Sequence, residues 1–364
     1  MKRTPFHHIH KTLGAKLIGF AGFEMPVQYP TGIVQEHLAV RNGVGVFDVS
    51  HMGEFEVSGT DAAAFLNRMT INDVSKLSVG RVQYSAMCYE DGGIVDDLLV
   101  YRLEDRFMTV VNASNLQKDF DWLHSHLKGD VRLLDKSEAT ALLAVQGPQS
   151  AQVLTGLTDV DLGDMRYYSW KRGTIAGVPM VISRTGYTGE MGYELYFEAN
   201  VETATKVWNS IFDAGKPFGI VPVGLGARDT LRLEMGFCLY GNDIDQTTNP
   251  LEAGLGWITK LDKTEFVGRE VLLEVKAGGL QRRLVGFVTG DKAVPRHRYR
   301  LMAGGRDTGV VTSGTFSPSL QHGIGMGYVA SANAVVGNEL AVDVRGKAVP
   351  AKVVKLPFLQ KTAT

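Results

Sequence analysis

The sequence predicts an α+β fold of several domains that ends in an all-β, barrel-like domain. Between about residues 52 and 135, a helical segment, a strand hairpin and a second helical segment follow one another, which is typical of a small α+β unit. After about residue 275, short apolar segments alternate with Gly, Asp and Asn turns, which is typical of a β-barrel. A chain of 364 residues is also longer than one hydrophobic core usually accommodates, so we expect two or three domains.

The expected helices follow from apolar residues that recur on one side at helical spacing. In residues 115–127, for example, Phe120, Leu123 and Leu127 form one stripe. The same spacing predicts the other helices, at residues 33–41, 61–69, 149–157, 201–214 and 226–235.

Strands are expected where apolar and polar residues alternate, or where a short apolar run ends at a turn. Within an extended segment at 44–58, Phe55 and Val57 alternate with Glu54 and Glu56. The remaining strands expected before the tail are residues 94–101 and 107–111, which a turn joins into a hairpin, and then 142–145, 178–183 and 193–198.

The charge and composition exclude some broad classes of function. Lys and Arg number 38 and Asp and Glu 39, so the net charge of −1 argues against a generally basic nucleic-acid binder. No apolar run approaches the roughly 18 residues that span a bilayer, so we expect no membrane contact. The two cysteines, Cys88 and Cys238, fit a reducing compartment, and the N-terminus has no apolar signal region. We therefore expect a cytoplasmic protein, or one already processed.

Sequence motifs for phosphate, metal and hydrolase sites are missing. The phosphate loop Gly-x-x-x-x-Gly-Lys-Ser/Thr is absent, and neither Gly224–Gly226 nor Gly323–Gly327 has the Gly-x-Gly-x-x-Gly spacing. No Cys-x-x-Cys pair exists, and His124 and His126 are too close in sequence to share a helix face. Without a Gly-x-Ser-x-Gly turn, a hydrolase of that type has no support either. We expect no dedicated metal site.

Two adjacent acids interrupt the apolar strand at residues 94–101. Because strand side chains alternate, Asp96 and Asp97 point to opposite faces. A buried unpaired carboxylate is costly, so an inward-facing one must be paired or have a task. A solvated edge strand explains the pattern equally well, and the residues alone leave both interpretations open.

A glycine-rich loop adds two further candidates. The segment 185–192 is longer than a plain hairpin requires and carries Tyr187, and Glu194 begins the following strand. A carboxylate at that place can hold a guanidine-like edge through two hydrogen bonds. The pattern alone nevertheless favours a surface loop with an ordinary exposed Glu.

Two arginines lie four residues apart in the helix expected at 226–235. Arg228 and Arg232 therefore share one helix face, where two guanidinium groups can clamp carboxylates. Asp229 and Glu234 can instead neutralise them as surface pairs, which is the usual outcome.

Eight short segments favour a functional interpretation of these candidates over an ordinary surface one, because the segments occur together in one order and at one spacing. They are Phe47–Gly53, Gly92–Asp97, Val111–Ser114, Gln146–Pro148, Arg184–Glu190, Gly224–Glu234, Leu239–Gly241 and Thr312–Pro318. Together they resemble the aminomethyltransferase, or T-protein, family of the glycine cleavage system. Each segment alone is weak evidence, whereas the ordered set is specific and extends over essentially the whole chain.

The resemblance implies a three-domain cloverleaf of the folate-binding aminomethyltransferase type, arranged around a central hole that holds tetrahydrofolate. The central α+β domain is expected at residues 1–51 together with 136–245, and a ferredoxin-like α+β domain at 52–135. The C-terminal barrel-like domain is expected at 275–364, with 246–274 as the connection.

The family's reaction implies substrates and partners. The methylene of the aminomethyl group on the lipoyl arm of H-protein passes to tetrahydrofolate, the acceptor substrate, and ammonia and the dihydrolipoyl arm are released. No metal, flavin or nicotinamide is expected as a cofactor, and neither nucleic acid nor a membrane as a partner. P-protein and L-protein are expected associates, in the bacterial cytoplasm or in the mitochondrial matrix of a processed eukaryotic form. A folate-dependent demethylase and a non-catalytic folate-binding accessory protein share the architecture and stay as alternatives.

The resemblance also implies roles for four polar residues. Asp97 matches the family's key aspartate near folate N10, so we expect it to orient the folate and stabilise positive charge at the developing iminium. Asn112 can support Asp97 from the end of the partner strand. Glu194 matches the acid that pairs with the pterin's 2-amino group and ring N–H, and Arg228 matches the arginine at the glutamyl side.

Five further residues match positions around the folate in the family. They are Met52, Tyr84, Tyr168, Tyr187 and Trp257. One departure concerns the C-terminus, where relatives can add a Tyr or Arg contact and this chain ends in Phe358–Thr364 with neither. Lys361 is the candidate replacement, and that contact stays open.

Overall fold

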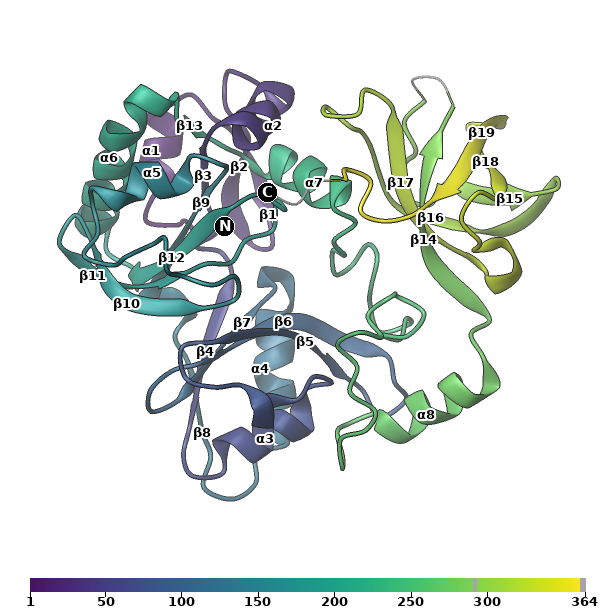
Figure 1. Ribbon diagram of the computed structural model, residues 1–364, viewed down its shortest axis with the longest axis horizontal. Coiled ribbons are helices and arrows are strands. Elements are labelled where there is room, and N and C mark those ends of the chain that lie inside the picture. The colour runs from purple at the N-terminus through teal and green to yellow at the C-terminus, as the bar shows by residue number, and fades with distance from the viewer. Residues whose placement is uncertain (291–292, 361–364) are drawn as a thin grey trace. The chain divides into compact units, whose positions relative to one another are not determined.

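The computed structural model describes residues 1–290 and 293–360 and confirms the α+β class with a C-terminal barrel (Figure 1). The chain forms two compact units. The first consists of Met1–Asn67, Val74–Tyr84 and Leu98–Arg228, and the second of Arg68–Asp73, Ser85–Asp97 and Asp229–Thr364. The three domain ranges expected from the sequence stay a prediction.

A six-stranded sheet with the order β10-β11-β12-β9-β3-β13 lies at the centre of the first unit. Its strands are β10 (Trp170–Ile175), β11 (Val178–Ser183), β12 (Gly192–Glu198), β9 (Thr140–Gln146), β3 (Gly45–Asp48) and β13 (Val221–Pro222). Neighbouring strands are antiparallel except β3 and β13, which run parallel. Residues 141–146 of β9 are all buried, which explains why this strand is a continuous apolar run up to its last residue.

Three helices pack against this sheet through one apolar cluster, to which Phe6, Leu154 and Trp208 belong. The helices are α1 (His7–Thr12), α5 (Ser150–Thr155) and α6 (Val201–Gly215). The Asn200 side chain accepts hydrogen bonds from the backbone N–H groups of Glu202 and Thr203 and so caps the start of α6.

A five-stranded sheet has the order β5-β6-β7-β4-β8. Its strands are β5 (Val82–Cys88), β6 (Ile94–Arg102), β7 (Phe107–Val111), β4 (Gly53–Ser58) and β8 (Arg132–Asp135), and its helices are α3 (Ala62–Met69) and α4 (Leu116–Ser125). The predicted hairpin is confirmed, since Leu98 of β6 pairs with Val111 of β7. Phe120 of α4 meets Phe55 of β4 edge to face, with ring centroids 5.4 Å apart, so α4 covers the face that carries Phe55.

The remaining elements of the first unit precede β3. They are the antiparallel hairpin of β1 (Lys16–Phe20) and β2 (Phe23–Gln28), and helix α2 (Ile33–Asn42). Periodicity predicts α2 but not the hairpin, because β1 is largely exposed and has no buried stripe. Short 3₁₀ turns occur along the chain at Val74–Lys76, Ala113–Asn115, Ser137–Ala139, Lys216–Phe218 and Ser331–Asn333.

The second unit contains a closed barrel with the order β14-β17-β16-β15-β18-β19, drawn in light green and yellow in Figure 1. Its strands are β14 (Arg282–Thr289), β15 (Arg300–Ala303), β16 (Arg306–Phe316), β17 (Gly323–Ala330), β18 (Glu339–Val344) and β19 (Lys347–Val354). Its core includes Phe287, Leu301 and Val353. Pairing of β14 with β19 closes the ring, so the barrel has no free sheet edge. Helix α8 (Arg269–Gly278) precedes it.

Helix α7 (Leu225–Glu234) begins in the first unit and ends in the second. Its Arg232 is 1 % exposed and forms a buried ion pair with Asp243, with Nη1 and Oδ2 2.6 Å apart. Arg232 Nη2 also donates to Ser313 Oγ of β16, at 2.9 Å. The carboxyl of Glu234 is buried as well and accepts from Ser319 Oγ at 2.9 Å. Of the surface pairs expected from the sequence, the pair between Asp229 and Arg232 is present, with Oδ1 2.7 Å from Nη2. Arg232 and Glu234 are nevertheless buried and not at the surface, because both side chains connect α7 to the barrel.

Replacement of Asp243 by Ala is expected to destabilise the second unit strongly. Without this buried partner, the Arg232 guanidinium would stay buried with only the half-exposed Asp229 carboxylate beside it, and removal of one partner of a buried ion pair costs about 3–5 kcal/mol. Chemical denaturation of the variant measures the loss. The control is Asp229→Ala, because the Asp229 side chain also pairs with Arg232 but is 51 % exposed, so its removal should cost less than about 1 kcal/mol. Equal losses in the two variants would contradict this interpretation.

Candidate active site

Glu194 lies inside the six-stranded sheet. In the register of the sheet, it pairs with Ser183 of β11 on one side and with Ala144 of β9 on the other. The residue is 9 % exposed. The ordinary exposed Glu that the pattern alone favours is therefore wrong, because the strand begins two residues earlier at Gly192 and runs between two neighbours.

A chain of hydroxyl groups surrounds the Glu194 carboxylate. Thr185 Oγ1 donates to Glu194 Oε2, and the Tyr196 hydroxyl lies 3.5 Å from the same oxygen. Tyr101 of β6 joins this group, with its hydroxyl 2.9 Å from that of Tyr196 and 3.1 Å from Ser183 Oγ. Burial raises the pKa of Glu194, while Thr185, Arg228 and Tyr196 act in the opposite direction. The network thus stabilises a carboxylate that the sheet removes from water.

Arg228 lies on the ring of Tyr187. Its guanidinium carbon is 4.6 Å from the ring centroid, a cation–π arrangement. Helix α7, which carries Arg228, begins after Gly224, whose N–H donates to Glu36 Oε2 at 2.8 Å. A Cβ on Gly224 would approach the Val27 carbonyl to 2.5 Å, so only glycine allows this close approach of α7 to β2.

The loop at 184–191 is held around the side chain of Gln146. Gln146 Nε2 donates to the Thr185 carbonyl at 3.1 Å, and its Oε1 accepts from Thr188 Oγ1 at 2.9 Å. A Cβ on Gly186 or Gly192 would come within 2.0 or 2.3 Å of this amide. Gly186 of the loop and Gly192 at the start of β12 therefore leave room for Gln146, which explains two of the glycines in this part of the sequence.

A buried ion pair fixes the same loop to α2. Arg41 Nη1 lies 2.8 Å from Glu190 Oε1 and donates to the Thr188 carbonyl at 2.5 Å. The two side chains are 6 % and 10 % exposed. Thr188 follows Tyr187 directly in the chain. The contacts of Arg41 with Glu190 and with the Thr188 carbonyl therefore also restrict the backbone that carries the Tyr187 ring, on which Arg228 lies.

Met52 follows a histidine that the sequence reasoning did not single out. Burial lowers the pKa of His51 to about 4, and the charge of Arg228 contributes, so the imidazole is neutral at physiological pH. Its ring packs edge to face against Phe20, with centroids 5.4 Å apart. The Met52 N–H donates to the Val49 carbonyl at 3.0 Å, and the residue is half-buried. The signal for His51 was its place in the segment Phe47–Gly53.

Tyr84 and Tyr168 belong to neighbouring backbone segments. The Val82 N–H donates to the Tyr168 carbonyl at 3.0 Å, and Tyr84 lies two residues further along β5. Tyr168 has a positive φ of 58°, and its N–H donates to the Arg184 carbonyl at 3.0 Å. These bonds connect both tyrosines to the start of the loop that carries Tyr187.

Asp97 and Asn112 flank the end of the β6–β7 ladder. Leu98 and Val111 form a pair of the ladder, Asp97 precedes the former, and Asn112 follows the latter. Asp97 is half-buried, whereas Asp96 is fully buried, so the expected alternation of the two acids is present. In the second unit the charge of Asp97 helps to raise the pKa of Cys238, after burial and Asp243.

Trp257 also belongs to the second unit. Its side chain is 66 % exposed, and its carbonyl accepts from Lys260 Nζ at 2.7 Å.

The structure thus brings Glu194, Arg228 and Tyr187 together, and it does not pack Trp257 into a core. Lys361 lies outside the described residues.

Comparison with known families assigns most of the chain. The GCVT N-terminal domain matches residues 6–263, and the glycine cleavage T-protein C-terminal barrel domain matches residues 282–360. The chain belongs to the glycine cleavage T-protein family. The resemblance stated from eight short segments is therefore confirmed.

Proteins of similar sequence or structure match this T-protein family member over nearly its full length. The aminomethyltransferase of Halothermothrix orenii is 51 % identical over 99 % of this chain and 100 % of its own, and that of Chloroherpeton thalassium is 55 % identical over 99 % of both. The crystal structure of glycine cleavage system aminomethyltransferase T from Bartonella henselae is 36 % identical, covers 98 % of both chains and has a TM-score of 0.91.

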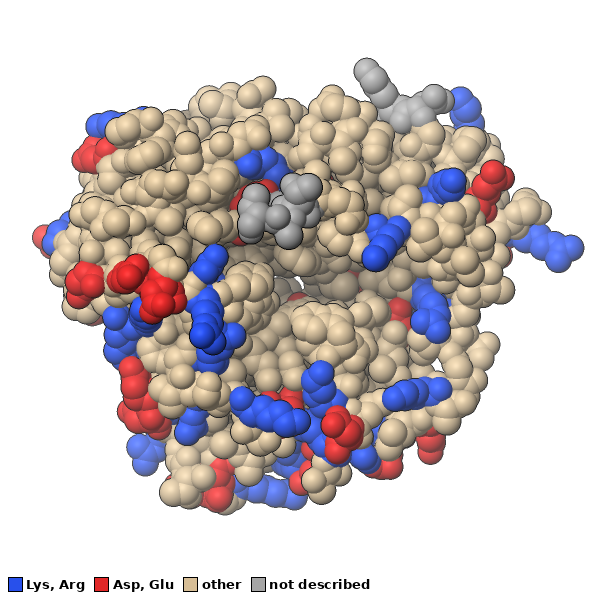
Figure 2. Space-filling model, viewed as in Figure 1, with Lys and Arg blue, Asp and Glu red and all other residues tan. Residues whose placement is uncertain are grey.

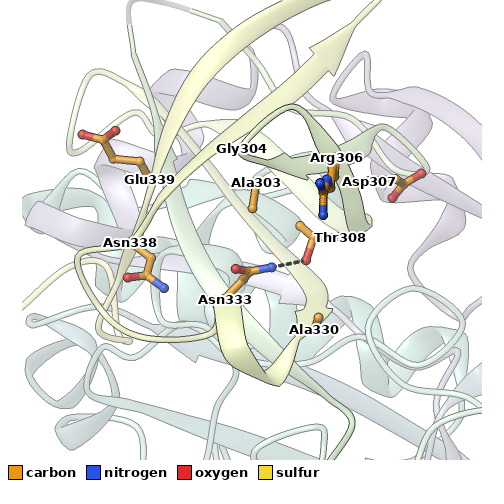
Figure 3. Close-up of a pocket in the computed structure, with 9 residues that line it drawn as sticks. All are labelled: Ala303, Gly304, Arg306, Asp307, Thr308, Ala330, Asn333, Asn338 and Glu339. Atoms are coloured by element: carbon orange, nitrogen blue, oxygen red, sulfur yellow. Dashed lines mark hydrogen bonds between the residues drawn. The ribbon is translucent and has the colours of Figure 1, made fainter.

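The barrel of the second unit has a pocket of its own. A pocket of about 550 Å³ in the barrel contains Arg306, Asp307 and Glu339, and Asn333 there donates to Thr308 Oγ1 at 2.7 Å (Figure 3). Positive and negative side chains are interspersed on the face shown in Figure 2. Among residues 1–290 and 293–360, no cluster of three or more His, Cys, Asp or Glu is placed to hold a metal ion. No helix in the same ranges is long and apolar enough to cross a membrane.

Replacement of Arg41 by Met is expected to loosen the loop at 184–191. The change leaves the Glu190 carboxylate buried and removes the hydrogen bond to the Thr188 carbonyl. Hydrogen exchange followed by mass spectrometry should show amides of this loop exchanging about tenfold faster or more, which corresponds to about 1.4 kcal/mol of local opening. The control is Arg3→Met, which removes an exposed pair with Glu24. Unchanged exchange in the loop would show that Arg41 does not hold it.

Proposed function

We propose that this chain transfers the methylene of the aminomethyl group on the lipoyl arm of H-protein to tetrahydrofolate, releasing ammonia and the dihydrolipoyl arm. The family match over both the N-terminal domain and the barrel carries the activity, since the family consists of tetrahydrofolate-dependent aminomethyltransferases.

Glu194 is the residue we assign to the pterin ring. Among the described residues, both hydrogen bonds to its carboxylate end on Oε2, so Oε1 remains for a ligand. An ionised carboxylate offers two oxygens to two adjacent donors, and the pterin's 2-amino group and ring N–H are such a pair. The surrounding hydroxyl groups support the assignment, because they hold the carboxylate in one orientation before the ligand arrives.

Arg228 is assigned to the glutamyl carboxylates of folate. Its planar guanidinium can hold a carboxylate through two parallel hydrogen bonds. The guanidinium lies on the Tyr187 ring, and its charge offsets part of the rise that burial causes in the pKa of Glu194. Movement of the guanidinium toward a carboxylate would leave the Tyr187 ring face open for the ligand.

Asp97 is the group we assign to the chemistry. As the methylene passes to folate, its bonds to the lipoyl sulfur and to the amino nitrogen break, and bonds to folate nitrogens form. A carboxylate near folate N10 stabilises the positive charge of the iminium that develops during this exchange. Asn112 is assigned a supporting contact to Asp97. The apolar and aromatic side chains that we assign to the folate surface are those of Met52, Tyr84, Tyr168, Tyr187 and Trp257.

The partners follow from the reaction. The donor is the lipoyl-carrying H-protein, and P-protein and L-protein supply and regenerate its arm. The expected location is the cytoplasm of a bacterium, since the relatives named above come from bacteria. The direct test is tetrahydrofolate-dependent ammonia release from aminomethyl-loaded H-protein by the purified chain. Release of ammonia together with methylenetetrahydrofolate supports the proposal, and folate binding without release contradicts it.

Replacement of Asp97 by Asn is expected to lower kcat by about 10²–10³ and to change folate affinity by no more than a few fold. The amide retains the shape of the side chain but not the charge that stabilises the iminium. Steady-state ammonia release and equilibrium folate binding measure the two quantities. Asp105→Asn, in the exposed turn after β6, is the control. Unchanged turnover in the first variant would remove Asp97 from the mechanism.

Replacement of Glu194 by Ala is expected to weaken tetrahydrofolate binding by about tenfold or more. The loss of a charged acceptor removes two hydrogen bonds, each worth about 1.5–3 kcal/mol before compensation by water. Isothermal titration calorimetry gives the affinity. Glu198→Ala in the same strand is a matched control, because Glu198 is exposed. An unaffected affinity in the Glu194 variant would show that the pterin assignment is wrong.

A further inference from the structure

Glu54 has no role in the reaction proposed above, although its carboxyl is buried in the interior of the first unit. The residue is 1 % exposed. Within residues 1–290 and 293–360, neither carboxyl oxygen has a hydrogen-bond partner. A buried polar group without a partner is rare in folded proteins, so a residue of this kind requires an explanation.

The sheet register shows which way Glu54 faces. Phe55 meets α4, so alternation places Glu54 on the other face of the five-stranded sheet. Glu56 of β4 lies opposite Met108 of β7, which lies opposite Tyr101 of β6. Residues directly opposite in a sheet share a face, so Glu54 belongs to the face from which Tyr101 reaches the hydroxyl network of Glu194.

The charged groups around Glu54 are acidic. Asp135 of β8 and Glu194 of β12 both act on its carboxyl, and Tyr196 of β12 feels the charge of Glu54 in turn. Burial and these two like charges raise the pKa of Glu54 well above its usual value. Glu194, by contrast, has Thr185, Arg228 and Tyr196 to stabilise its charged form.

We propose that Glu54 and Glu194 form a coupled carboxyl pair in which Glu194 ionises first and Glu54 keeps its proton until a ligand engages Glu194. This inference rests on the proposed assignment of Glu194 to the pterin edge. Two carboxyls that interact in a protein interior lose their protons in two separate steps. The second proton leaves Glu54 for solvent, and no other reactant is required.

Ligand binding and this second proton are linked. Donors that bind Glu194 offset part of its negative charge, so the repulsion that holds the proton on Glu54 falls. Binding therefore lowers the pKa of Glu54, and affinity must rise as pH increases through the second step. Glu54 thus acts through Glu194 as a positioning residue whose ionisation strengthens the charge that faces the pterin.

Glu54→Gln separates the two steps, because Gln retains the size of the side chain and cannot ionise. Binding of tetrahydrofolate to the full chain is measured by isothermal titration calorimetry between about pH 5 and about pH 9, in two buffers of different ionisation enthalpy. The wild type is expected to show two rises in affinity and to release a fraction of a proton during the second, with a gain of about threefold to tenfold. The Gln variant retains the first rise, which belongs to Glu194, and lacks the second. Titration of the ligand itself contributes equally to both.

Thermal unfolding provides a readout that needs no ligand. A carboxyl with a raised pKa contributes stability that is complete below its unfolded-state pKa and is lost as pH rises through its folded-state pKa. The thermal unfolding midpoint of the Glu54→Gln variant should therefore be higher than that of the wild type. The difference should grow with pH, to about 3 °C. Glu56→Gln is the matched control, because Glu56 is in the same strand and on the same face but pairs with Arg106 at 3.0 Å.

The outcomes are distinct. Two binding steps in the wild type and one in Glu54→Gln, with the pH-dependent gain in midpoint, support the proposal. Identical pH profiles and proton counts in the two proteins overturn it. Failure of the wild type to bind tetrahydrofolate contradicts the proposed function instead. In that case the thermal unfolding data still test the carboxyl pair, and a difference in unfolding midpoint between the wild type and Glu54→Gln that does not change with pH overturns it.

Discussion

The burial of a carboxylate within a sheet is the constraint on which much of the first unit depends. Glu194 has neighbours on both sides in the six-stranded sheet, so its charge must be stabilised by protein groups. Thr185 and Tyr196 donate to it or lie beside it, and Tyr101 arrives from the other sheet of the same unit. The two sheets are therefore joined by a polar network at the place where an apolar contact would be simpler to build. A hydrogen-bonded network of this kind is rigid, which suits a group that must recognise a planar ligand edge.

The loop beside this network shows how one side chain determines the sequence around it. Gln146 occupies the space where side chains of Gly186 and Gly192 would lie, and its amide bonds the loop backbone. Arg41 and Glu190 hold the outer end of the loop through a buried ion pair. Tyr187 is thus presented by a rigid loop, and Arg228 lies on its ring. The second unit uses a comparable device, since Arg232 and Asp243 connect α7 to the barrel.

Much of the fold follows from local pattern. The hairpin of β6 and β7, helices α6 and α7 and the strands of the barrel have clear periodicity or turn residues, because each buries apolar side chains along one face. The β1–β2 hairpin has no such signal, since β1 buries almost nothing. Among the candidate site residues, Asp97, Glu194 and Arg228 were selected through an ordered set of short segments. Tyr101 and Tyr196 were not, because nothing in their own surroundings marks them as neighbours of Glu194. His51 was not selected either, although it lies in one of those segments.

The sequence by itself determined the fold class, the family and the residue types available to the site. The fold class and the residue types follow from local patterns, and the family follows from the order of short segments. Both kinds of information are present in the sequence itself. Only the tertiary structure decided which side chains are removed from water and which charges meet. The ordinary exposed Glu that the pattern favours at position 194 is a buried one. Arg232 is buried although its expected pair with Asp229 is present, and neither carboxyl oxygen of Glu54 has a hydrogen-bond partner within the described residues. Burial and electrostatic coupling depend on contacts between residues far apart in the chain, and for that reason no reading of neighbouring residues could supply them.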